Sequence, residues 1–343
     1  MQIVIATWFH GDDADTSSLF SQVGGDSTSK EFQAIYWRCV LVFLASSIRW
    51  NPDCRHALVT NLPDLPAVDG LPVEEWCKRH KVTIIKPVPL SRVTPKGFWD
   101  SWKNQFYVYD ALDSVGNRFP DADVVMLFDS DCVWLAPHYG LTSVVMTKRA
   151  AVYTLPYGPD HVENGVRVAD IMPIGRRLLG LDCSCVVSAY HGGDVIACDR
   201  DSLHFLLRNV SRLYDENLIA WHSGQPYLKE EAHFLSVLYG ILDVAPSTAN
   251  PFFRRIWTGP NYCDLRPSDE GLDIWHLPNE KRLGLARLYR RAIDDDSWFW
   301  KVDQDQFRRL VGRLVGIPRR SPLKHLWARV MNRVERIARQ EVW

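Results

Sequence analysis

The stretch Asp123-Val-Val-Met-Leu-Phe-Asp129-Ser130-Asp131 decides the fold of this 343-residue chain. Its five consecutive apolar residues, 124–128, are typical of a central strand that is covered by helices on both faces. Two aspartates follow directly where the strand ends. Open α/β sheets bind ligands outside the carboxyl ends of their strands. The stretch therefore predicts a buried central strand with a polar site at its end.

The segments around this strand alternate between strand and helix patterns. Apolar runs predict strands, and apolar residues at helical spacing predict helices. Strands separated by helices need crossover connections, so we expect a mostly parallel sheet. In the first half we expect strands over 3–8, 56–60, 82–88 and 122–128, and helices over 31–48, 73–80 and 99–112. In the second half we expect strands over 144–153, 186–198 and 240–244, and helices over 201–215 and 229–238.

The composition excludes several classes of protein. Charges nearly balance, with 40 Lys+Arg against 41 Asp+Glu, which argues against a nucleic-acid binder that works through global positive charge. Hydrophobic residues make up 46% of the chain, so disorder on a large scale is excluded. The longest apolar stretch, around 39–45, is far shorter than the ~20 residues of a membrane-spanning helix. The amino-terminal run MQIVIATWF predicts a first strand and not a signal peptide. We therefore expect a cytoplasmic protein.

The carboxylate pair at 129 and 131 is the strongest chemical feature. The sequence contains six Asp-x-Asp patterns, but this pair directly follows the long buried strand. Two carboxylates at this spacing can approach one hard cation together, and Mg²⁺ and Mn²⁺ prefer oxygen ligands. We therefore expect Asp129 and Asp131 to bind Mn²⁺ or Mg²⁺. The structural alternative is a pair of acidic residues that caps the next turn.

Two enzyme classes place aspartates in this way. Asp129-Ser-Asp131-Cys-Val133 fits the motif of haloacid-dehalogenase-like phosphatases, in which the first aspartate is a nucleophile. That motif normally lies on the first strand, whereas here a long run of strands and helices precedes it. The preceding run Phe43-Leu-Ala-Ser-Ser-Ile-Arg-Trp-Asn51-Pro52-Asp53, followed by Ala57-Leu-Val-Thr60-Asn61, resembles the nucleotide-binding half of glycosyltransferases with the GT-A fold. The resemblance covers roughly residues 2–280.

This resemblance implies the GT-A (Rossmann-like) variety of α/β fold. The glycosyltransferase domain would span 1–280, with a nucleotide-binding half at 1–135 and an acceptor-side half at 136–280. A helical extension would follow at 281–343. The implied activity is that of a metal-dependent glycosyltransferase of hexosyltransferase type. It would move a sugar from a UDP- or GDP-sugar to a carbohydrate, lipid-linked or protein acceptor.

Two other functions stay open at this point. One is a haloacid-dehalogenase-like phosphohydrolase with Asp129 as the nucleophile. The other is a GT-A domain without activity that binds a partner through its basic tail.

The resemblance also implies roles on the nucleotide side of the site. The first strand would bring Thr7 and Trp8 to the base and ribose, and Asn61 follows the second strand. Lys103 lies where such enzymes place a cation near the diphosphate. His276 would complete the metal shell of Asp129 and Asp131, with a core histidine as the alternative. The nucleotide-binding set is Thr7, Trp8, Asn61, Lys103, Asp129, Ser130 and Lys281.

Three carboxylates are the catalytic candidates. Asp194 follows a pair of glycines and would hydrogen-bond the donor sugar or take the proton of the acceptor. Glu230 and Glu231 open a helix and are the other candidates for the acceptor base of an inverting enzyme. A retaining enzyme needs no separate base. A turn aspartate and ordinary first-turn acids are the structural alternatives.

The tail over 319–343 is basic and carries its apolar residues on one helical face. A helix of this kind can lie on an anionic membrane surface, here the inner face of the membrane. It can equally pack on its own domain or on a second subunit, and both alternatives stay open.

Overall fold

The computed structural model describes residues 1–17, 20, 22–99, 101–182, 189–259 and 262–319. Its centre is a six-stranded sheet with the order β5-β2-β1-β6-β11-β8. β1 (Ile3–Phe9) lies in the middle and pairs in parallel with β2 (Arg55–Thr60) and with β6 (Val124–Phe128). All five residues of β6 are buried, as the apolar run predicts.

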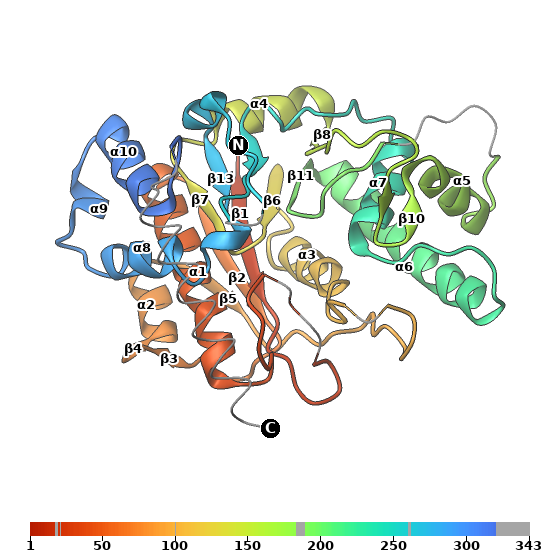
Figure 1. Cartoon of the computed structure of the whole chain (residues 1–343), viewed down its shortest axis with the longest axis horizontal. Coiled ribbons are helices and arrows are strands. Elements are labelled where there is room, and N and C mark those ends of the chain that lie inside the picture. Colours follow the sequence, from red (N-terminus) through yellow and green to blue (C-terminus); the bar gives the residue numbers. More distant parts are fainter. Residues whose placement is uncertain (18–19, 21, 100, 183–188, 260–261, 320–343) are drawn as a thin grey trace.

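The other strands complete a mixed sheet. β5 (Thr83–Ile85) pairs in parallel with β2. β11 (Val195–Asp199) runs antiparallel to β6 and to the short edge strand β8 (Ala150–Ala151). The chain therefore has the expected α/β architecture, with a mostly parallel central sheet flanked by helices (Figure 1).

Helices cover the sheet and begin where polar caps are available. α1 (Lys30–Trp50) begins after Ser29, whose side chain accepts a hydrogen bond from the Phe32 backbone N–H. α6 (Arg200–His222) is capped in the same way by Asp199. The remaining helices of the first three quarters of the chain are α2 (Val73–Arg79), α3 (Tyr107–Arg118), α4 (Tyr139–Lys148), α5 (Val168–Leu178) and α7 (Glu231–Ile241).

A second, three-stranded sheet continues from the carboxyl end of β6. β7 (Cys132–Trp134) pairs antiparallel with β13 (Ile274–His276), and β13 pairs in parallel with β12 (Phe253–Arg255). In this way residues far apart in the sequence meet beside Asp129 and Asp131. Two short hairpins complete the strands, β3 (Ala67–Val68) with β4 (Leu71–Pro72) and β9 (Val162–Glu163) with β10 (Val166–Arg167).

The last described helices pack back onto the first one. α8 (Gly284–Ala292) contacts α1, and α10 (Gln304–Val315) contacts α8, beside the short α9 (Trp298–Lys301). Figure 1 shows these blue elements on the α1 side of the sheet, opposite the green helices α5, α6 and α7. None of the described helices is long and apolar enough to cross a membrane. The basic tail from 320 onward lies outside the described residues, so its two alternatives remain predictions.

Four expected elements differ from the structure. Residues 144–148 belong to α4, because Leu141 and Val145 face inward at helical spacing, and strand β8 is confined to 150–151. The expected strand at 240–244 is the end of α7 and a turn. The third helix begins at Tyr107 and not at 99. The expected strand over 186–198 is described from residue 189, and there it is limited to β11 at 195–199.

The buried histidine on β2 predicts how stability depends on pH. His56 is 6% exposed and its Nε2 lies 3.0 Å from the Ser47 hydroxyl. Burial lowers the pKa of His56 to about 4. Between pH 6.5 and 4 the unfolded chain binds the proton more tightly, so the free energy of unfolding falls as the pH falls. We expect His56 to account for roughly 3 kcal/mol of this loss.

Chemical denaturation of wild type and His56→Gln across this pH range measures the contribution. The His56→Gln profile should be flatter by about that amount, whereas His204→Gln, at an exposed site on α6, should keep the wild-type profile. Equal slopes in wild type and His56→Gln would contradict the prediction.

Candidate metal and ligand site

Three backbone segments converge at the carboxyl end of β6. Asp129 directly follows β6, and its N–H donates to the Asp194 carbonyl at 3.0 Å. Because β11 is antiparallel to β6, its first residue, Val195, pairs with Phe128, and Asp194 therefore lies beside Asp129. His276 ends β13 opposite Cys132. The two sheets thus place carboxylates and an imidazole at one point.

These side chains form a compact group with the chemistry of a metal site. One ligand atom from each of Asp129, Asp194 and His276 lies within 4.8 Å of the others. The His276 Nδ1 lies 2.8 Å from Asp194 Oδ1, and its Nε2 lies 3.9 Å from Asp129 Oδ2. Carboxylate and imidazole ligands suit Mn²⁺, and carboxylates suit Mg²⁺. The residues present therefore fit a divalent cation.

From the sequence we expect Asp131 to be a metal ligand together with Asp129 and His276. In the structure Asp131 is 4% exposed, pairs with the Lys281 ammonium, and lies 3.0 Å from His276 Nε2. The group within ligand distance contains Asp194 instead. The side chain of Asp129 is 31% exposed, whereas those of Asp131 and Asp194 are 5% and 2% exposed. Asp129 is thus the carboxylate of this group that an incoming ligand reaches first.

Buried charges in the group neutralise one another. Burial would lower the pKa of His276, but Asp131 and Asp194 outweigh burial and raise it to about 9. Burial would raise the pKa of Asp131, but His276 and Lys281 hold it well below its usual range. Burial would likewise raise the pKa of Asp194, but Arg255 and His276 hold it well below its usual range. Arg255 Nε lies 2.7 Å from Asp194 Oδ1, and Arg255 Nη2 lies 2.8 Å from Asp194 Oδ2. The bidentate pair fixes the Asp194 carboxylate in one orientation.

A second acidic group lies at the start of α7. Glu230 is 4% exposed and receives the Tyr190 hydroxyl at 2.8 Å and the Asn164 amide, and His233 Nε2 lies 3.1 Å from it. Burial raises the pKa of Glu230 to about 7. Burial, and then the charge of Glu230, raise the pKa of Glu231 to about 8. Both carboxyls therefore titrate near neutral pH.

Both groups open onto one pocket, and most of the predicted site residues line it. The pocket also takes in an aromatic wall and the segment after β1. The predicted residues in its lining are Trp8, Asp129, Ser130, Asp131, Asp194, Glu230, Glu231, His276 and Lys281.

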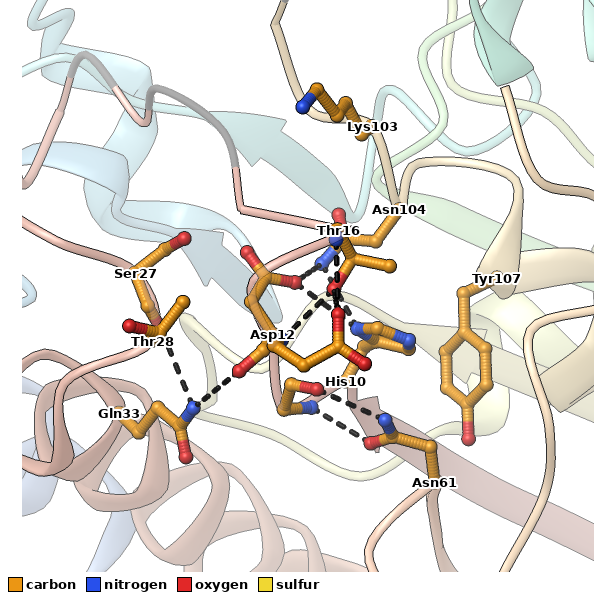
Figure 2. Close-up of polar contacts among 12 residues, drawn as sticks. His10, Asp12, Thr16, Ser27, Thr28, Gln33, Asn61, Lys103, Asn104 and Tyr107 are labelled. Carbon is orange, nitrogen blue, oxygen red and sulfur yellow. Dashed lines mark hydrogen bonds and ion pairs between the residues drawn. The ribbon is translucent and has the colours of Figure 1, made fainter. Parts of the chain in front are cut away.

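Three predicted residues lie outside the pocket lining. Thr7 is fully buried, and its hydroxyl donates to the Phe128 carbonyl at 2.9 Å, which ties β1 to β6. Asn61 holds the backbone of Gly11 through two hydrogen bonds. Figure 2 shows the Lys103 side chain extending away from the contacts around Asp12. Their assigned roles in nucleotide binding stay predictions.

Sequence reasoning missed Asp12, Arg255 and Tyr190 in the pocket lining. The rule that selected Asp129 applies equally to the polar residues after the first strand, and it would have found Asp12. Arg254 and Arg255 are adjacent on a short strand and so point to opposite faces, which predicts one inward arginine. No pattern in the sequence links Tyr190 to Glu230, because their contact depends on tertiary packing.

Comparisons with known proteins give a limited result. No protein-family profile matches the sequence, and no curated protein matches it. Among solved structures, the chain is similar to mouse xyloside xylosyltransferase 1 in its apo form, with a TM-score of 0.42 and 10% sequence identity. The similarity covers 80% of this chain and 97% of that one. The geometry of the site, and not this likeness, supports the function proposed for the chain.

The metal group predicts the effect of one substitution. Asp129→Asn replaces a charged oxygen ligand with a neutral amide, so we expect Mn²⁺ to bind at least about tenfold more weakly. Calorimetric titration of Mn²⁺ measures the affinity, and circular dichroism checks the fold. Asp113→Asn, at an exposed position on α3, is the matched control. An unchanged Mn²⁺ affinity in folded Asp129→Asn would remove Asp129 from the metal site.

Proposed function

We propose that this chain is a metal-dependent glycosyltransferase that moves a sugar from a nucleoside-diphosphate sugar to an acceptor. The observation that carries the proposal is that the metal-type group Asp129–Asp194–His276 and the carboxyls of Glu230 and Glu231 line one pocket. A cation stabilises a donor diphosphate, and an inverting enzyme needs a base for the acceptor hydroxyl. The pocket offers both kinds of group within one cavity.

The donor side of the pocket is suited to a diphosphate. A bound divalent cation would supply Lewis-acid stabilisation of the charge that develops on the departing nucleoside diphosphate. Asp129, Asp194 and His276 would hold it. Lys281 and Arg255 line the same pocket and add fixed positive charge near the diphosphate. Each is paired with a buried aspartate, which keeps it in place.

The acceptor side favours Glu231 over Glu230 as the base. Glu230 already receives hydrogen bonds from Tyr190 and Asn164. The carboxylate of Glu231 lies against Gly193, where a Cβ atom would come within 2.6 Å of Oε1. Glycine at this position thus lets Glu231 approach the segment that carries Asp194. A carboxylate with a pKa near the working pH is well matched to take a proton from a hydroxyl.

Binding of nucleoside diphosphates tests the proposed function. UDP and GDP are titrated into wild type and Asp129→Asn with and without Mn²⁺, because either base is compatible with the family resemblance. We expect binding that depends on Mn²⁺ and is weakened at least about tenfold by Asp129→Asn. Failure of both nucleotides to bind, with Mg²⁺-dependent release of phosphate from an aryl phosphate, would instead support the phosphohydrolase with Asp129 as the nucleophile.

The substitution Glu231→Gln tests whether Glu231 is the acceptor base of an inverting enzyme. We expect kcat for turnover of the bound nucleotide sugar to fall by about 10²- to 10⁴-fold, because the amide cannot accept the proton. In wild type the rate should rise with pH between 7 and 8 as the raised pKa of Glu231 is passed and the carboxyl ionises. Glu75→Gln, at an exposed site on α2, is the control. Full activity of folded Glu231→Gln would exclude Glu231 as the base and favour a retaining mechanism.

The remaining assignments are part of the same proposal and await tests of their own. They are the choice between Mn²⁺ and Mg²⁺, the nature of the acceptor and the division into domains at 135 and 280. The cytoplasmic location and the contact of the basic tail with a membrane surface also belong to this set.

A further inference from the structure

Asp12 lies three residues after β1 and is held in a defined orientation. It is 7% exposed, and its Oδ1 receives the Asn104 amide at 2.8 Å and lies 3.1 Å from His10 Nδ1. The Gln33 amide donates to its backbone carbonyl at 3.2 Å. Figure 2 shows these contacts gathered around Asp12 from the segment after β1, from α1 and from the residues before α3.

The backbone beside Asp12 is fixed as well. The Gly11 N–H donates to Asn61 Oδ1 at 2.7 Å, and the Asn61 amide donates back to the Gly11 carbonyl at 3.0 Å. A Cβ atom at Gly11 would come within 2.7 Å of Leu62 Cδ2, so a glycine is needed for this close approach. The two residues after β2 therefore clamp the chain next to Asp12.

The second carboxylate oxygen of Asp12 is unsatisfied. Within the described part of the chain, Oδ2 is buried and has no hydrogen-bond partner. Asp12 nevertheless lines the pocket that contains the metal group and Lys281. A buried carboxylate oxygen without a donor is unfavourable, and a ligand that supplies an N–H relieves the cost. The arrangement therefore selects a ligand with one hydrogen-bond donor at this point.

The pocket also contains a group of opposite character, a hydrogen-bond donor. The indole Nε1 of Trp8 is also buried without a partner among the described residues, and Trp8 lines the same pocket. The Trp8 ring lies 5.8 Å from the Tyr107 ring, which in turn lies 4.8 Å from the His10 ring. Trp8 Nε1 suits a carbonyl, and Asp12 Oδ2 suits an N–H. A planar ring that carries an N–H between carbonyls satisfies both.

We propose that Asp12 determines the base of the donor nucleotide and that this base is a pyrimidine-2,4-dione, uracil or thymine. This inference rests on the proposed function. The base N3–H would donate to Asp12 Oδ2, and a flanking carbonyl would accept from Trp8. Guanine presents two adjacent donors and is best matched by both carboxylate oxygens, but Oδ1 is already taken by Asn104 and His10. Cytosine and adenine carry a lone pair on the corresponding ring nitrogen, which a carboxylate oxygen repels.

Calorimetry with UDP, dTDP, CDP, GDP and N3-methyl-UDP, all with Mn²⁺, tests the proposal on wild type. We expect UDP or dTDP to bind about 10- to 100-fold more tightly than the other three. CDP and N3-methyl-UDP lack the ring N–H, and GDP presents a second donor that the occupied Oδ1 does not accept. The comparison of UDP with N3-methyl-UDP needs no substitution, so it does not depend on a variant that folds. The comparison of UDP with dTDP separates the two diones by their 5-methyl group.

Asp12→Asn, checked for its fold by thermal unfolding, completes the experiment. Its amide can donate to the ring nitrogen of cytosine, so the preference for UDP over CDP should shrink to less than about threefold. Asp15→Asn, at an exposed position in the same segment, should keep the wild-type preference. Equal binding of UDP and N3-methyl-UDP, a preference for GDP, or an unchanged preference in Asp12→Asn would overturn the role of Asp12 and leave the proposed function standing. Failure of every nucleotide to bind would overturn both.

Discussion

The paired contacts of His276 are the constraint on which the rest of the site depends. One ring nitrogen lies 2.8 Å from Asp194, and the other lies 3.0 Å from Asp131. Asp194 precedes β11 of the large sheet, whereas His276 ends β13 of the small one. The imidazole therefore joins the two sheets. Arg255 and Lys281 supply the remaining charge, so that the buried carboxylates are matched by buried cations. Removal of one member would leave its partner as an uncompensated buried charge, which is strongly destabilising.

This network divides the three aspartates into two kinds. Asp131 and Asp194 are almost completely buried and are each held by two cationic groups. Asp129 lies at the edge, partly exposed, with His276 Nε2 3.9 Å away. The buried pair can fix the geometry while Asp129 meets the ligand. An arrangement of this kind keeps the reactive side of the site rigid without filling it.

The predictable part of the fold is the part set by local pattern. The apolar run of β6 and the Asp129 that follows it could be found because a central strand of a parallel sheet is apolar on both faces. The apolar residues at 144–146 were misassigned, since β-branched residues in a short apolar run favour a strand until packing of Leu141 and Val145 selects the helix. Asp12 and Arg255 lie just after a strand and on a strand, at positions that the same local patterns could have found. Tyr190 could not be found in this way, because the tertiary fold brings its hydroxyl to Glu230 and local sequence carries no record of a partner 40 residues away.

The order of the chain has a consequence for how the site comes into being. Lys281 pairs with Asp131 across 150 residues, and α8, which follows Lys281, packs on α1 near the amino terminus. During synthesis Asp12, Asp129 and Asp131 emerge long before His276 and Lys281. The growing chain must therefore carry unmatched carboxylates at the edge of its first sheet until its last quarter arrives. Ligand recognition is therefore a property that the chain acquires only after Lys281 has been synthesised.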